Sequence, residues 1–179
     1  MRAIDALNGR YHRAASLTFL VVVVAHWAEH LTQAYQIWVL GRSVPQSRGV
    51  LGQFFPWLVK SEWLHYGYAI VMLIGLFVLR KGFVGRAGKW WRAALYIQVW
   101  HHLEHLILLL QALTGAYLLG RALPTSFLQL LFPRVELHLF YNAAVFLPML
   151  VAMYLHIRPR QIEVGSMPCT CAQVRPATV

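Results

Sequence analysis

Acidic residues are scarce in this chain, which has six carboxylate side chains in 179 residues against 16 lysines and arginines. Only 12% of the residues are charged and 59% are hydrophobic. This composition is typical of membrane proteins and excludes an ordinary soluble domain with a charged surface. The basic residues lie between apolar segments, where lysine and arginine set membrane topology. We therefore expect the lipid bilayer, and no nucleic acid, as a partner.

Cysteine is also scarce, since Cys169 and Cys171 are the two in the chain. Two cysteines are too few for a disulfide framework, and in a reducing cytosol we expect them to be thiols. Linker-like stretches rich in serine and glycine are lacking too. We therefore predict a single transmembrane domain over residues 1–160 and a flexible cytoplasmic tail over residues 161–179.

Long apolar runs are the main positive feature of the sequence. They predict an all-α integral membrane protein in which four transmembrane helices form a bundle. The predicted helices cover residues 14–40, 57–79, 90–119 and 135–157, with a short interfacial helix at 126–131. The amino terminus, the loop at 80–92 and the tail carry 11 lysines and arginines, and the other two loops carry 5. By the positive-inside tendency, both termini are cytoplasmic in a multi-pass protein of the inner (cytoplasmic) membrane.

The two halves of the chain resemble each other. Residues 40–47 match residues 119–126, and residues 64–68 match residues 137–141. The order of the matches is preserved, with offsets of 73 to 79 residues. We interpret this as a duplicated helical hairpin, with repeats at about 14–80 and 90–158. The symmetry predicts that the first and third helices face each other.

Two copies of the pattern His-x-x-Glu-His lie within apolar runs. The first copy comprises His26, Glu29 and His30, and the second His101, Glu104 and His105. Residues at i, i+3 and i+4 share one face of a helix. Ionisable groups at bilayer depth cost about 2.5–3.5 kcal/mol each, so such clusters need a compensating partner. A bound metal ion is the partner that this donor set indicates.

The other two helices add further ligand types. Glu62 and His65 form Glu-x-x-His, and His138 matches His65 in the repeat. The predicted metal ligands are His26, Glu29, His30, Glu62, His65, His101, Glu104, His105 and His138. Glu136 is left out, because i and i+2 do not face together on a helix. His102 points about 100° away from His101. His12 and His156 lie near the cytoplasmic boundary, and we interpret all three histidines as packing residues.

Mixed imidazole and carboxylate ligands suit iron, manganese or zinc, whereas an all-histidine site favours copper. The sequence-based prediction is a dinuclear, non-haem iron centre, analogous to the soluble di-iron bundles. A b-type haem electron-transfer subunit is one alternative, since His30 and His105 could be drawn as axial ligands. A transition-metal transporter or metal-handling protein is the other. The tight i, i+4 histidine pairs and the adjacent glutamates favour the non-haem centre.

An intramembrane redox centre would act on molecules that partition into lipid. We therefore predict a metal-dependent oxidoreductase that uses dioxygen or a lipophilic small molecule, acting as a homo-oligomer or as a subunit of a larger membrane complex. Tyr68 and Tyr141 lie within a turn of His65 or His138 and are the predicted catalytic residues; interfacial anchoring is the alternative role for them. Gln33 and Gln98 are predicted to orient the ligating imidazoles.

Overall fold

The structure, a computed structural model, describes residues 3–172 and is helical without strands over that range. Four long helices are α2 (His12–Trp38), α5 (Glu62–Leu79), α6 (Gly85–Thr114) and α7 (Arg134–Ile157). The short helices are α1 (Ala3–Asn8), α3 (Leu51–Phe54), α4 (Pro56–Val59) and α8 (Gln161–Val164), and the 3-10 turns are η1 (Val44–Gln46), η2 (Leu118–Gly120) and η3 (Leu128–Leu130). Residues 173–179 of the predicted tail lie outside the described residues.

Three of these helices, α2, α5 and α7, are long and apolar enough to cross a membrane, which is consistent with a membrane protein. Many apolar side chains on their outer faces are exposed, among them Val21, Ile74 and Leu147, as expected for surfaces that contact lipid. The 30-residue α6 is not among the three. Its first turns are basic, with Arg86, Lys89 and Arg92. A fourth span therefore stays a prediction.

The predicted helix ends are close to the observed ones, with two informative differences. The predicted helix over 57–79 is interrupted, because the Ser61 hydroxyl accepts a 3.2 Å hydrogen bond from the Trp63 N–H and begins α5 as an N-cap. Helix α6 begins and ends about five residues before the predicted span. It ends at Gly115, whose φ of +69° is the left-handed conformation that terminates helices. Of the interfacial helix predicted at 126–131, η3 forms one turn.

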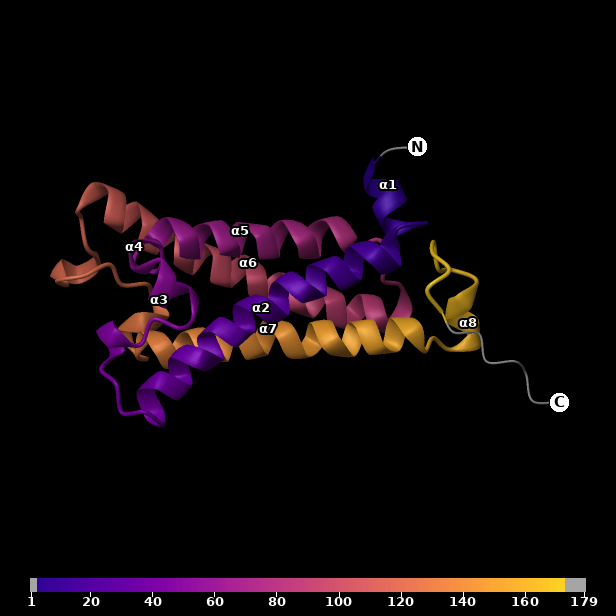
Figure 1. The fold of residues 1–179 in the computed structure, drawn as a ribbon. Coiled ribbons are helices and arrows are strands. Elements are labelled where there is room, and N and C mark those ends of the chain that lie inside the picture. Colours follow the sequence, from indigo (N-terminus) through magenta and orange to yellow (C-terminus); the bar gives the residue numbers. More distant parts are fainter. Residues whose placement is uncertain (1–2, 173–179) are drawn as a thin grey trace.

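Helices α5, α6 and α7 run side by side, and α2 crosses them obliquely (Figure 1). Both described ends of the chain, with α1 and α8, lie at one end of the bundle, here called the terminal end (Figure 1). The loop end carries residues 39–61 and 115–133, the first and second loops. Whether the terminal end faces the cytoplasm stays a prediction.

The hydrophobic core lies in the half of the bundle nearer the terminal end. Trp91 is completely buried, and its indole N–H donates a 2.8 Å hydrogen bond to the Leu76 carbonyl. Phe19 of α2 lies directly against Gly75 of α5, where any side chain would overlap the phenyl ring. Small residues at such crossings let helices approach closely, because membrane helices associate through packing rather than the hydrophobic effect.

The first part of the tail is bound to the bundle through Glu163 of α8. Its carboxylate accepts hydrogen bonds from the backbone N–H of Arg160 and of Arg86, and forms a 3.3 Å ion pair with the Arg86 guanidinium. These contacts lower the pKa of Glu163 to about 2. A depressed pKa means that the stabilisation is complete above the ordinary carboxyl pKa and is lost as the pH falls through about 2.

The bundle predicts where introduced cysteines can be labelled. Single cysteines at the exposed positions Arg42, Lys81 and Arg121, in a Cys169→Ser/Cys171→Ser background, should react with impermeant maleimide from two sides of the membrane. We expect Arg42 and Arg121 to share one side and Lys81 to lie on the other, because the loops at the two ends of the helices are separated by the apolar spans. Labelling of Arg42 and Lys81 from the same side would contradict this topology.

Candidate metal centre

Six histidines from four helices line one cavity between the long helices. We call them the six-histidine cluster: His26, His30, His65, His101, His105 and His138. All six belong to the ligand set predicted from the sequence. His30, His101, His105 and His138 are each less than a tenth exposed. The cavity lies toward the loop end, since His65 and His138 belong to the first turns of α5 and α7.

Within the cluster, the histidines four residues apart form two equivalent pairs. The Nε2 atoms of His26 and His30 are 3.1 Å apart, and those of His101 and His105 are 3.2 Å apart. The Nδ1 of His30 is bonded to the Gln33 side-chain oxygen at 3.1 Å, as the sequence predicted for Gln33. The second pair has no such orienting group among the described residues, where the Nδ1 atoms of His101 and His105 are buried without a hydrogen-bond partner.

His65, near the start of α5, and His138, near the start of α7, complete the cluster. The Nδ1 of His65 bonds to the Ser61 carbonyl at 3.0 Å, and the Nδ1 of His138 bonds to the Arg134 carbonyl at 2.8 Å. A ring whose Nδ1–H is held by a carbonyl presents an unprotonated Nε2, which is the form that binds metal. The Nε2 of His138 is buried and has no hydrogen-bond partner among the described residues. Its ring centroid lies 5.1 Å from that of His105 and 5.6 Å from that of His30.

The glutamates of the two motifs contact the loops. Glu29 accepts hydrogen bonds from the backbone N–H of Val50 at 3.0 Å and of Leu51 at 2.8 Å. Gly49, with a φ of +65°, leaves room for this carboxylate, since a side chain there would overlap it. Glu29 thereby holds the first loop against the bundle.

Glu104 does the same in the second half of the chain. It accepts hydrogen bonds from the Ser126 hydroxyl and from the Leu128 N–H, the latter at 3.3 Å. Glutamines seven residues further on make equivalent contacts, because Gln36 binds the backbone of Gly49 and Gln111 binds that of Thr125. The residues that the predicted duplication pairs therefore have corresponding partners, although the duplication itself stays a prediction.

Glu62, the third predicted carboxylate ligand, forms an ion pair with Arg134 at 2.7 Å. The pair joins the first residues of α5 and α7, one turn before His65 and His138. Each of the three predicted carboxylate ligands thus has a partner within the protein, and metal binding by any of them stays a prediction.

The two predicted catalytic tyrosines pack on the first histidine of each motif. Tyr68 stacks on His26 with ring centroids 3.6 Å apart, and Tyr141 lies 4.4 Å from His101. The hydroxyl of Tyr68 donates to the Val22 carbonyl at 2.7 Å. The hydroxyl of Tyr141 accepts a hydrogen bond from the Trp100 indole. The structure therefore places both tyrosines beside the cluster, where they restrict the orientation of these rings.

The remaining polar residues lie outside the cluster or bind elsewhere. Gln98 lines the cavity, but its amide donates to the Ala69 carbonyl at 3.1 Å rather than to an imidazole. His102 packs beside Tyr66, with centroids 5.2 Å apart. Glu136 is exposed on α7. His102 and Glu136 do not line the cavity of the six-histidine cluster.

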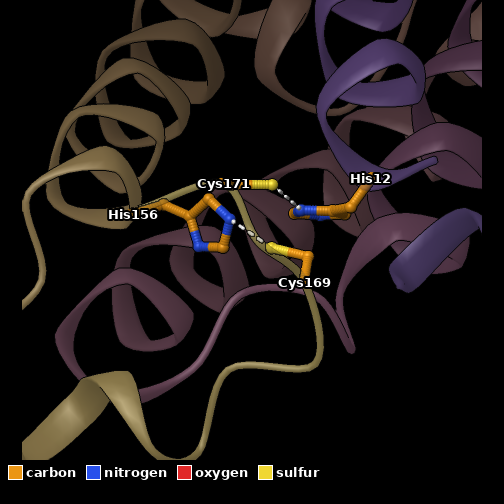
Figure 2. Close-up of side chains that lie close together, drawn as sticks. All are labelled: His12, His156, Cys169 and Cys171. Carbon is orange, nitrogen blue, oxygen red and sulfur yellow. Dashed lines mark hydrogen bonds between the residues drawn. The ribbon is translucent and has the colours of Figure 1, made fainter. Parts of the chain in front are cut away.

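A second group of ligand types lies at the terminal end (Figure 2). His12 begins α2, His156 lies in the last turn of α7, and Cys169 and Cys171 come from the tail. One donor atom from each lies within 4.8 Å of those of the other three, so this His/Cys group could hold a metal ion. Burial and the neighbouring Cys169 thiol raise the pKa of the Cys171 thiol above its ordinary value.

Sequence reasoning missed this group, because it interpreted His12 and His156 as packing residues and the cysteines as part of a flexible tail. Both histidines are buried, at 0% and 5% exposed. Part of the signal was present: two histidines at the same predicted depth, and a Cys-Thr-Cys sequence a short distance after the second of them. No sequence pattern reported the return of the tail.

Comparisons of the chain with known protein families, with curated proteins and with solved structures found no match.

The contacts of Glu29 and Glu104 predict the effect of removing their charge. Glu29→Gln and Glu104→Gln should each lower the free energy of unfolding by about 1–3 kcal/mol, the contribution of hydrogen bonds to a charged group. The loss should appear as a lower melting temperature and faster amide exchange at residues 49–51 or 126–128.

Glu136→Gln is the matched control, because Glu136 is exposed, and it should leave the melting temperature unchanged. Amide exchange in the loops that is unaffected by Glu104→Gln would contradict the loop-binding role.

Proposed function

We propose that this chain is an integral membrane metalloprotein whose six-histidine cluster holds transition-metal ions for redox chemistry within the bilayer. One observation carries the proposal: six imidazoles from four helices converge on a single cavity, and the Nε2 of His138 is buried there without a partner among the described residues. Buried polar atoms normally find a partner, so this unpaired Nε2 favours a missing ligand. The proposed location is the cytoplasmic membrane, with both termini inside.

The spacing within the pairs supports metal binding. Nitrogen ligands lie about 2.0–2.1 Å from an ion such as zinc, so two adjacent ligands are roughly 2.9–3.4 Å apart. The Nε2 separations of 3.1 and 3.2 Å in the two pairs fall within this interval. Each pair therefore suits one ion. His65 and His138 each supply a third imidazole, one to each ion. We propose a dinuclear centre with three histidines for each ion.

The hydrogen bonds of the glutamates bear on the identity of the metal. A prediction of iron depended on carboxylates joining the imidazoles. Glu29 and Glu104 are bound by loop groups and do not line the cavity of the cluster. The metal-ligand types that line this cavity are therefore imidazoles, which suits copper as well as iron. We propose copper or iron, with copper favoured; zinc lacks redox chemistry and manganese prefers oxygen ligands.

The geometry is less favourable for the two alternatives. A flat haem group needs empty space between its two axial histidines. In this cavity, any two histidines chosen as axial ligands are surrounded by the rings of the other four. Metal transport would need a polar path along the bundle. The core toward the terminal end is instead filled by Leu76, Trp91 and Met149, each completely buried.

A groove between α2 and α5 gives the cluster access from the lipid side. It has a volume of about 1060 Å³ including its open mouth. Its lining includes His26, His30 and His65, and most of the other lining residues are apolar, such as Val21 and Leu64. We propose that a lipophilic substrate, of which a quinone is the simplest example, or dioxygen reaches the centre here.

The proposal predicts about two copper or iron ions per chain in protein purified without chelators, measured by elemental analysis. His101→Ala and His105→Ala should each lose at least one ion, because each removes a donor from a buried site, and should lower the melting temperature as bound metal is lost.

His102→Ala is the matched control for this measurement, one residue away on the same helix but outside the cluster, and should retain both ions. Equal losses in all three variants would indicate unspecific damage to α6 and would contradict the proposal. A strong Soret band that shifts on reduction would replace it with haem.

The groove predicts a second outcome. Ala25 lines it, so Ala25→Phe should slow reoxidation of the reduced centre by a short-chain lipophilic quinone, about tenfold or more, while metal content is retained. Ala28→Phe, exposed on the same helix, should react at the normal rate. Stopped-flow spectroscopy of the metal bands measures both, and equal rates in the two variants would exclude this route.

A further inference from the structure

The His/Cys group differs from the six-histidine cluster in location and in chemistry. It lies at the opposite end of the bundle, and the helix segments between the two groups pack in the hydrophobic core. Its donors are two imidazoles and two thiols, with no carboxylate among them. Calcium and magnesium prefer oxygen ligands, so this set suits a softer ion.

We propose that His12, His156, Cys169 and Cys171 form a tetrahedral zinc site that closes when the tail returns to the bundle. Two thiolates and two imidazoles are a common ligand set of structural zinc sites. With a Zn–S distance near 2.3 Å and a Zn–N distance near 2.0 Å, a tetrahedral ion separates a sulfur and a nitrogen ligand by about 3.5 Å. The Sγ of Cys169 lies 3.3 Å from His156 Nε2, and the Sγ of Cys171 lies 3.7 Å from His12 Nδ1 (Figure 2). These two sulfur–nitrogen distances are close to the separation that a tetrahedral zinc ion requires.

The surroundings hold the two imidazoles in position. The Nε2 of His12 lies 3.4 Å from the Ser16 hydroxyl, which leaves Nδ1 directed at Cys171. Phe83 packs against both histidine rings at 4.8 Å. Gly82 lies beneath His12, and a methyl group there would overlap the ring. Such outer groups orient ligands and exclude water around a metal.

The site joins three segments that are far apart in the sequence: the start of α2, the end of α7 and the returning tail. Thiols are weak hydrogen-bond donors, so without an ion the two cysteines hold the tail weakly. A zinc ion would deprotonate them and form bonds to both helices. Binding to the closed form alone stabilises that form, which makes the tail a zinc-dependent latch. The latch is independent of the proposed redox centre.

Cobalt titration of the purified full-length protein, stripped of metal under reducing conditions, tests the site. Tetrahedral thiolate–Co²⁺ gives visible ligand-field bands and a near-ultraviolet charge-transfer band, and zinc should abolish both by displacement. We expect the charge-transfer signal to correspond to one equivalent of bound cobalt in the wild type and in His105→Ala, and to be absent in Cys169→Ser/Cys171→Ser. An unchanged signal in the double variant would overturn the site, and its presence in His105→Ala keeps this result separate from the six-histidine cluster.

A glycine pair tests the geometry without touching a ligand. Gly82→Ala should weaken cobalt binding about tenfold or more, because the added methyl group displaces His12. Gly165→Ala should bind normally, since that position has open space and a φ of −65°. Equal affinity in the two variants would show that the His12 position is not used.

Tryptic cleavage after Arg160, which is exposed where the tail begins, tests the latch. Zinc should slow this cleavage about tenfold in the wild type and leave it unchanged in Cys169→Ser/Cys171→Ser. Bound zinc with no protection of the wild type would overturn the latch.

Discussion

The structure depends on one constraint: a polar group placed among long apolar helices needs a partner inside the protein. Glu29 and Glu104 find theirs in loop N–H and hydroxyl groups, and Glu62 finds one in Arg134. The carboxylates therefore hold both loops and join two helix starts. The imidazoles are only partly satisfied, because carbonyls fix one side of His65 and His138 and leave the other side facing the cavity. We propose that this difference separates residues that hold the fold from residues that bind metal.

Much of the fold followed from the sequence because apolar runs and helix length are local properties. The ends of α2 and α7 differ from the predicted ones by at most two residues. The larger errors arose at caps. Ser61 begins a new helix within the predicted span, where Lys60, Ser61 and Glu62 interrupt the apolar run, and Gly115 ends α6 although apolar residues follow it. Cap geometry depends on single residues and on the path of the following loop, which hydropathy does not report.

The candidate site shows where local periodicity is sufficient and where it fails. The spacing i, i+4 placed the histidine pairs correctly, because it is a property of one helix. The same reasoning placed Glu29 and Glu104 beside them without showing that these longer side chains reach residues 21 to 24 positions away. The His/Cys group joins His12 to Cys171, 159 positions apart. Contacts of that separation depend on tertiary structure, and a single sequence gives no measure of them.

The placement of His65 and His138 in the first turns of their helices has a consequence for charge movement. At a rise of about 1.5 Å per residue, they lie only about 4.5–6 Å along the axis from Glu62 and Arg134, where the loops begin. If the proposed redox centre is present, protons taken up or released during turnover would therefore exchange with the compartment at the loop end. Electrons delivered from the same side would cross little of the membrane potential. Such a centre would consume its substrate without storing much energy as a transmembrane gradient.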